Sequence, residues 1–191
     1  MENINFAAIC FLISFFYIGL KFPDIDFKIK GLRHRSILTH SFFLPAILFV
    51  LHITNTLNVM WQSSTDITGT VIAGLSFGMT LHFLYDLRPK KFVGSALIQF
   101  PFTQGYKKRN ALTATQTVMW LIGSSIIQSL ISVYYISSYY ETTVLIGCTV
   151  FTLYFKRNSE KGFYSVIFMF IAIFFLSFYL RNYTATLIDL F

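Results

Sequence analysis

The sequence predicts an all-α polytopic membrane protein, in which residues 1–191 form a single transmembrane domain of about six helices. Of its 191 residues, 55% are hydrophobic and only 12% are charged, and phenylalanine alone occupies 23 positions. A soluble domain is typically about a quarter charged. Six helices of ~20 residues would use ~120 residues, which leaves no room for a separate soluble domain. The composition therefore excludes soluble globular, disordered and disulfide-scaffold proteins.

Apolar runs mark the expected helices in order, at roughly 4–20, 41–60, 68–87, 116–136, 142–155 and 163–180. The first run has neither a basic segment in front of it nor a small-residue cleavage site, so we expect a retained helix and not a signal peptide. The fifth run is shorter than the ~20 residues that usually cross a bilayer. Cys10 and Cys148 lie inside apolar runs and are interpreted as small buried hydrophobic residues.

The basic residues of the predicted loops alternate along the chain. The 21–40, 88–115 and 156–162 loops carry five, six and three Lys or Arg, whereas the 61–67 loop and the turn near Glu141 carry none. By the positive-inside rule, the three basic loops face the cytoplasm. The alternation also supports the short fifth span, because without it the 156–162 loop would lie on the wrong side. We therefore expect a multi-pass protein of the cell membrane.

Ionisable residues gather in two short windows. Three of the eight acidic residues and three of the four histidines fall there: Asp24, Asp26, His34 and His40 in the first, and His82 and Asp86 in the second. Such residues are costly within or beside a membrane span and suggest function. The first window lies in the first basic loop, and the third span ends at the second window on the same cytoplasmic face. One site can therefore form at the cytoplasmic ends of the first three spans.

The spacing within the windows suits metal ligation. His82 and Asp86 are four residues apart, so they lie one turn apart on one helix face and can reach a single ion. Asp24 and Asp26 follow Pro23, which favours an extended backbone there. Both carboxylates could meet an ion, or one of them could orient another ligand.

The two histidines of the first window are expected in different surroundings. His34 is expected in the loop and His40 near the start of the next helix, where Thr39 or Ser41 can cap it. Mixed imidazole and carboxylate ligands favour zinc, and also manganese or iron, over calcium or magnesium. Six candidate ligands suffice for one site with supporting partners or for a two-metal site.

Simpler structural interpretations exist for each of these residues. His82 could form a hydrogen bond between helices, and Asp86 could pair with it or with Arg88 or Arg33. The two aspartates of the first window could neutralise the basic loop and cap a helix. His52 lies in the second span, away from the cytoplasmic end, and is interpreted as structural. The functional interpretation depends on the co-location of all six candidates and not on any one of them.

Two sequence elements carry a family resemblance: His34-Arg35-Ser36-Ile37-Leu38-Thr39-His40-Ser41 and His82-Phe83-Leu84-Tyr85-Asp86-Leu87, with Gly94 and Pro101-Phe102 further along. At these residues the chain resembles the bacterial inner-membrane metal-dependent hydrolases, the YdjM-like, LexA-regulated group. The resemblance covers about residues 1–102, and residues 103–191 match by hydrophobicity only. The chain departs from the family pattern at Phe27, where the family usually has a histidine, at Phe22, where it has leucine, and at Arg88-Pro89.

The resemblance implies a hydrolase of the inner membrane that uses metal-activated water. The implied ligands or general base are Asp24, Asp26, His34, His40, His82 and Asp86, and the catalytic residues among them are Asp24, His34 and Asp86. Arg33, Arg35 and Arg88 are placed to neutralise an anionic substrate. The second element is also similar to a sequence element of the zinc-dependent phospholipases C. This similarity points, by analogy only, to a phosphoester as the substrate. A site at headgroup depth makes membrane lipids the expected partners and a lipid or lipid-linked molecule the expected substrate; no nucleic acid is expected.

Two other functions are open at this stage. The protein could be a non-enzymatic membrane protein with a structural or regulatory metal cluster, which Phe27 in place of the family histidine favours. It could also transport a metal or protons, with His82 and Asp86 as a relay. Transport fits less well, because the ionisable residues gather at one face and only His52 could extend a path through the membrane.

Overall fold

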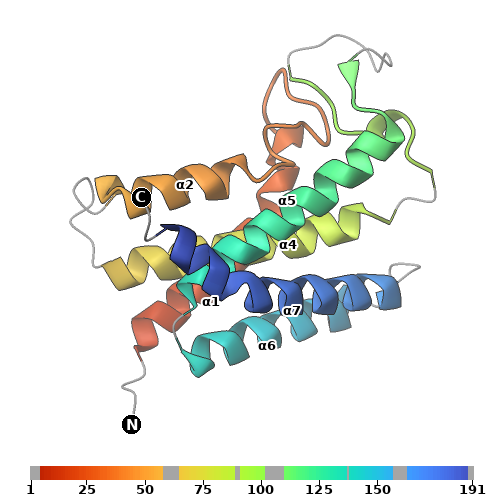
Figure 1. Ribbon diagram of the computed structural model, residues 1–191. Coiled ribbons are helices and arrows are strands. Elements are labelled where there is room, and N and C mark those ends of the chain that lie inside the picture. The colour runs from red at the N-terminus through yellow and green to blue at the C-terminus, as the bar shows by residue number, and fades with distance from the viewer. Residues whose placement is uncertain are drawn as a thin grey trace.

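The computed structural model describes residues 5–57, 65–88, 91–101, 110–136, 138–156 and 163–188, and its architecture is helical throughout (Figure 1). Six α-helices and two 3₁₀ helices follow one another in the described part of the chain: α1 (Phe6–Lys21), η1 (Pro23–Phe27), α2 (Phe43–Ile53), α4 (Thr65–Asp86), η2 (Gly94–Ala96), α5 (Ala114–Tyr135), α6 (Tyr139–Lys156) and α7 (Phe163–Ile188). Isolated β-bridges join Gln99 to Ser36 and Ala111, but these residues form no β-strand. The predicted all-α class is confirmed.

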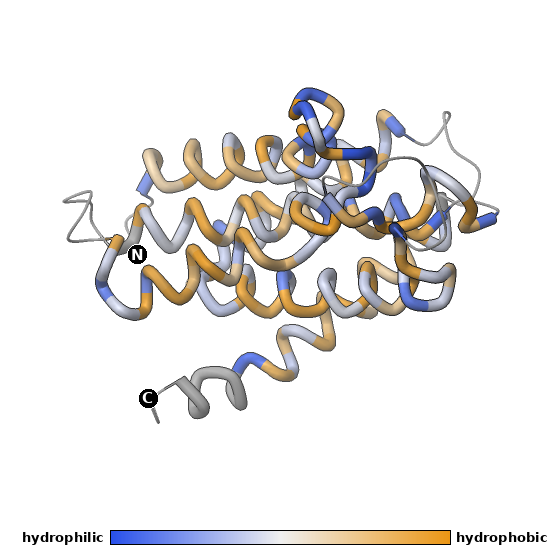
Figure 2. Tube along the Cα trace, turned by 90° about the horizontal axis from the view of Figure 1, so that it is seen from above, coloured by the Kyte–Doolittle hydropathy of each residue, from blue (hydrophilic) through white to orange (hydrophobic). Residues whose placement is uncertain are grey.

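Among the described residues, three helices are long and apolar enough to cross a membrane: Ile67–Asp86 in α4, Ala114–Tyr135 in α5 and Tyr164–Arg181 in α7. The two helices before them, α1 and α2, are apolar but shorter. The helices are largely apolar along their length, and most hydrophilic residues lie in the connecting loops (Figure 2). This composition agrees with a membrane location.

The predicted second span is the clearest difference from the sequence-based expectation. The expected run 41–60 contains α2, a helix of only 11 residues, which spans about 16 Å of a hydrocarbon core of ~30 Å. The helix ends at Ile53 because Asn55 adopts a left-handed conformation with φ of 61°, a frequent way to end a helix. Residues 58–60 of the expected run lie outside the described residues.

The packing of α1 against α4 determines where the ends of both helices lie. On α4, Gly74 and Gly78 are four residues apart, and a Cβ atom on either would press into the backbone of α1 at Leu12 or Phe16. Small residues at this spacing let two membrane helices approach closely. Because the two backbones are in contact, the carbonyl at the end of α1 reaches the last turn of α4, where Leu20 O lies 3.0 Å from His82 Nδ1.

The helix α5 runs antiparallel to α4 and is tied to it by side chains. The Ser132 hydroxyl donates to Ala73 O at 2.9 Å, near the start of α4, and Thr80 donates to Ser125 O at 3.5 Å, further along. A capping box of Thr113 and Gln116 fixes the first turn of α5. The helices α6 and α7 cover the remaining sides, and Figure 1 shows α4 passing through the middle of the bundle.

Candidate metal centre

The two aspartates of the first window lie in η1, which begins as soon as α1 ends. Pro23 occupies the first helical position, where its fixed φ and missing N–H are tolerated. The prediction of an extended backbone after Pro23 is therefore wrong, because residues 23–27 form a 3₁₀ helix. In a 3₁₀ helix, residues two positions apart point in different directions. Asp26 consequently turns inward, with 1% of its surface exposed, while the Asp24 side chain remains 43% exposed.

A tight loop between His34 and Ser41 brings His40 into the interior. Arg35 adopts a left-handed conformation with φ of 59°. The backbone on either side of Ser36 pairs with Gln99: the N–H of Gln99 donates to Arg35 O at 2.8 Å, and the N–H of Ile37 donates to Gln99 O at 2.9 Å. The N–H of His40 then donates to Ser36 O at 2.8 Å. As expected, His34 lies in the loop and His40 lies just before the next helix.

The expected cap on α2 takes a different form. The N-cap residue is Phe42, and its side chain makes no capping hydrogen bond. The Ser41 hydroxyl oxygen instead accepts a hydrogen bond from the N–H of Phe43 at 3.3 Å. The Thr39 hydroxyl donates to Asp26 at 3.2 Å, so Thr39 serves the candidate site and not the helix.

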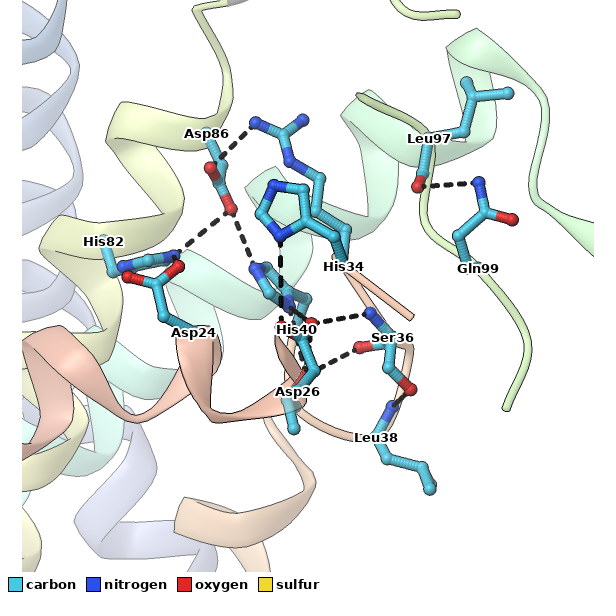
Figure 3. A network of polar contacts seen from close by, with 12 residues as sticks. Asp24, Asp26, His34, Ser36, Leu38, His40, His82, Asp86, Leu97 and Gln99 are labelled. Atoms are coloured by element: carbon cyan, nitrogen blue, oxygen red, sulfur yellow. Dashed lines mark hydrogen bonds and ion pairs between the residues drawn. The ribbon is translucent and has the colours of Figure 1, made fainter. Parts of the chain in front are cut away.

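Three residues direct their ligand atoms at one point (Figure 3). His40 Nε2 and His82 Nε2 lie 3.1 Å and 3.4 Å from Asp86 Oδ2. One ligand atom from each of the three residues lies within 4.8 Å of the others. His40 is fully buried and His82 nearly so. Within the described part of the chain, these same three atoms are buried and have no hydrogen-bond partner.

The second polar atom of each residue is held by the protein. His82 Nδ1 faces Leu20 O at 3.0 Å, and because a carbonyl only accepts, Nδ1 must carry the proton. His40 Nδ1 lies 3.4 Å from Asp26 Oδ2. Asp86 Oδ1 accepts a hydrogen bond from Arg35 at 2.8 Å. When both imidazoles are neutral and His40 carries its proton on Nδ1, facing Asp26, three lone pairs converge, and a metal cation can satisfy them together. Metal-ligating histidines are oriented in the same way, by a carboxylate or a carbonyl on the other ring nitrogen.

Asp26 and His40 form the electrostatic centre of the loop. Burial alone would raise the pKa of Asp26, but hydrogen bonds with His34, His40 and Ser36 N hold it far below its ordinary value, so Asp26 stays ionised. Burial opposes the charged form of His40, yet Asp26 and Asp86 raise the pKa of His40 above its ordinary value. A proton and a metal ion would consequently compete for His40 Nε2.

The other predicted ligands lie beside the three converging atoms. Asp24 Oδ1 is 3.8 Å from His82 Nε2. His34 Nδ1 is 3.9 Å from Asp26 Oδ1, and its ring lies 6.0 Å from that of His40. Phe27 stacks on His34 with ring centroids 4.3 Å apart. The structure thus brings all six predicted residues together, with Asp24 and His34 at the side and Asp26 behind His40.

The arginines are divided between different tasks. The Arg35 guanidinium is buried and donates to Asp86 Oδ1 and to Ala96 O, both at 2.8 Å. A buried position of this kind fits a residue that orients Asp86, and it fits less well a residue that binds a substrate. The sequence-based alternative paired Asp86 with Arg88 or Arg33, whereas the salt bridge is to Arg35. Arg88 lies at the end of α4, with its guanidinium carbon 5.8 Å from the centre of the Tyr85 ring.

Two residues of the C-terminal half complete the site, and sequence reasoning missed them. Trp120 Nε1 donates to His40 O at 2.9 Å, and Gln128 Nε2 donates to Ser41 O at 3.0 Å. The available signal was an amide side chain in the middle of a predicted span, and the structure buries Gln128 fully in α5. His52 lies elsewhere, with Nδ1 2.8 Å from the Tyr135 hydroxyl, which fits its structural interpretation.

No family model, curated protein or solved structure matches this chain. The candidate site therefore rests on its own geometry: His40, His82 and Asp86 could hold a metal ion.

Proposed function

We propose that this chain is a membrane-embedded metal-dependent hydrolase that acts on a phosphoester in a lipid or lipid-linked substrate. The observation that carries the proposal is the convergence of three buried ligand atoms without hydrogen-bond partners among the described residues. His40, His82 and Asp86 would hold the metal. Two imidazole nitrogens and one carboxylate suit zinc, and also manganese or iron.

Three protein ligands leave a coordination position open, as in catalytic zinc sites. A metal ion bound there would polarise the scissile group and lower the pKa of a water molecule to about 7. Asp24 lies 3.8 Å from His82 Nε2 and is partly exposed, so it suits a general base that accepts a proton from the attacking water. His34, whose Nδ1 faces Asp26, suits the proton donor to the leaving oxygen when the phosphorus–oxygen bond breaks.

The surface beside the site supports a lipid substrate. Phe27 stacks on His34 but is itself 67% exposed, and Ile25 and Ile29 of the same loop are exposed as well. Lys28 and Lys30 lie between and beside them and are also exposed. Alternating apolar and basic side chains fit the headgroup region of a membrane. The site lies at the end of the candidate span Ile67–Asp86, which would place it at that depth.

The remaining features of the proposal come from the sequence. Arg33 and Arg88 would meet the negative charge of the phosphoester. The alternation of basic loops would place the site on the cytoplasmic side of the inner membrane.

Metal content measured by elemental mass spectrometry tests the proposal first. We expect ~1 metal ion per chain in the detergent-purified wild type and none in a His40→Ala/His82→Ala variant. His52→Ala is the matched control, because it removes a histidine whose partner Tyr135 lies away from the site. A metal-loaded wild type that hydrolyses no phosphodiester lipid would contradict the activity. A wild type without metal after reconstitution would contradict the centre itself.

A non-enzymatic role is the second candidate, and one observation favours it. Asp26, His40, Asp86 and Arg35 form a chain of alternating charges if His40 is protonated, and this network could stabilise the loop without a metal. In that case, His40→Ala would lower the melting temperature, and neither metal binding nor turnover would be detectable in the wild type.

A further inference from the structure

The backbone that carries His40 is not part of a helix, so other elements must hold it. His40 lies between the turn at Ser36 and the first residue of α2, and its own N–H makes one local hydrogen bond, to Ser36 O. The other two ligands differ, because His82 and Asp86 belong to the last turns of α4 and are fixed by its backbone. The position of His40 relative to them therefore depends on contacts outside its own segment.

Gln99 and Asp26 hold the loop before His40, and the helix α5 holds the carbonyls of His40 itself and of the next residue. Trp120 Nε1 donates to the carbonyl of His40 at 2.9 Å, and Gln128 Nε2 donates to the next carbonyl, that of Ser41, at 3.0 Å. The Trp120 ring also packs against Phe42 and Phe43, with centroids 6.0 Å and 5.9 Å away. Trp120 and Gln128, two helical turns apart, thus hold two consecutive carbonyls. Trp120 also holds the two aromatic side chains that follow them.

The same helix is anchored to the element that carries the other ligands. Ser132 donates to Ala73 O and Thr80 donates to Ser125 O, so α5 is connected to α4 at two heights. His40 and Gln128 are fully buried, and Ser41 is as well, which leaves the segment little freedom to move independently. In this way α5 connects the loop ligand to the two helix ligands.

We propose that Trp120 and Gln128 are positioning residues of the metal centre: by holding the carbonyls of His40 and Ser41, they set the distance of His40 Nε2 from His82 and Asp86. The inference rests on the proposed metal centre and adds to it a helix from the half of the chain that shows no motif. Outer partners that orient a metal ligand typically change metal affinity when they are removed.

Cobalt binding by the full-length protein in detergent tests this inference without any turnover. Trp120→Phe keeps an aromatic ring against Phe42 and Phe43 but removes the N–H, and Gln128→Leu removes the amide. We expect each substitution to weaken Co²⁺ binding roughly 10- to 100-fold and to change the visible absorption spectrum of the bound ion, because the angle at which His40 approaches is altered. The melting temperature of each metal-free variant is measured alongside.

The matched control is Ser132→Ala, which removes a hydrogen bond from the same helix to Ala73 O, away from the site. It should lower the melting temperature but leave Co²⁺ affinity and spectrum as in the wild type. Wild-type affinity and an unchanged spectrum in both Trp120→Phe and Gln128→Leu would overturn the inference while the metal centre stands. If one of the two variants does not fold, the other decides. A wild type that binds no Co²⁺ would overturn the centre and this inference with it.

Discussion

The helices α4 and α7 are both apolar and long enough to cross a membrane, yet they have opposite surroundings. Of the candidate span in α4, 89% is buried inside the protein, whereas for α7 the share is 17%. The helices packed against each span explain the difference, since α4 lies between α1 and α5. Gly78 of α4 lies against the α1 backbone, while α7 carries Phe168 and Phe175, which are 75% and 69% exposed.

This difference shows why the ligands belong to α4. A helix with neighbours on all sides has side chains whose rotamers are restricted by packing, so His82 can be aimed by Leu20 O from α1. None of the candidate site residues comes from the described part of α7. The inner helix therefore carries two of the three candidate metal ligands, and the outer helix carries none in its described part.

The largest effect is expected from adding a side-chain atom where the backbones of α1 and α4 touch. Gly78→Ala would place a methyl group against Phe16 O, and because the obstacle is backbone, we expect a loss of about 3 kcal/mol in the free energy of unfolding. Gly147→Ala in α6 is the control, since a Cβ there meets no described atom within 4 Å. Denaturant titration in detergent measures both. Equal stability of the two variants would contradict close packing of α1 on α4.

Removing the metal should have the next largest effect. A metal ion at 100 times its dissociation constant adds about 2.7 kcal/mol to the stability of the folded state. Chelation should therefore lower the melting temperature of the wild type but leave that of His40→Ala unchanged. Phe168→Leu, on the outer face of α7, should retain the full response. A wild type that melts at the same temperature with zinc and with chelator would argue against the site.

The next effect in size is the pH dependence of the stabilisation that a bound metal provides. The raised pKa of His40 means that its protonated form stabilises the metal-free fold. This contribution is complete below the ordinary histidine pKa of about 6.5 and is lost as the pH rises through the higher folded value. Metal affinity changes in the opposite direction, by about 1.4 kcal/mol per pH unit for each proton displaced. The difference in melting temperature between metal-loaded and chelated protein should therefore grow as the pH rises from about 5 until it passes the raised pKa of His40. A constant difference would show that His40 is not a ligand.

The smallest effect is expected on the outer face of α7. Phe168→Leu should change the free energy of unfolding by less than about 0.5 kcal/mol, because the ring is exposed. Phe77→Leu in α4 is the contrasting variant: its ring is fully buried against Phe170 and Phe174, and we expect a loss of about 1 kcal/mol or more. Thermal unfolding of the two variants would separate inner from outer positions.

The sequence predicted the helical class from local hydrophobic patterns and the meeting of the two windows from the alternation of basic loops along the chain. His82 and Asp86 share a face through helical periodicity alone, and their place at the end of an apolar run follows from its length. The length of α2 was not predicted, because the left-handed conformation of Asn55 is not encoded in hydrophobicity.

The internal order of the site could not be predicted for a different reason. The pairing of Arg35 with Asp86 joins residues 51 positions apart, and no local signal distinguishes Arg35 from Arg33 as the partner. The roles of Asp24 and Asp26 separate only because η1 is a 3₁₀ turn. Gly74 and Gly78 did carry a signal: two small residues four positions apart within an apolar span point to close helix packing.

The long reach of α5 has a consequence for the order of synthesis. Trp120 and Gln128 contact residues 80 and 87 positions earlier in the chain. A nascent chain that has emerged as far as Asp86 already contains every ligand, but the peptide of His40 has not yet met the helix that holds it. Assembly of the complete site thus waits for the insertion of α5, so the ligand geometry would report on whether the second half of the protein has been inserted correctly.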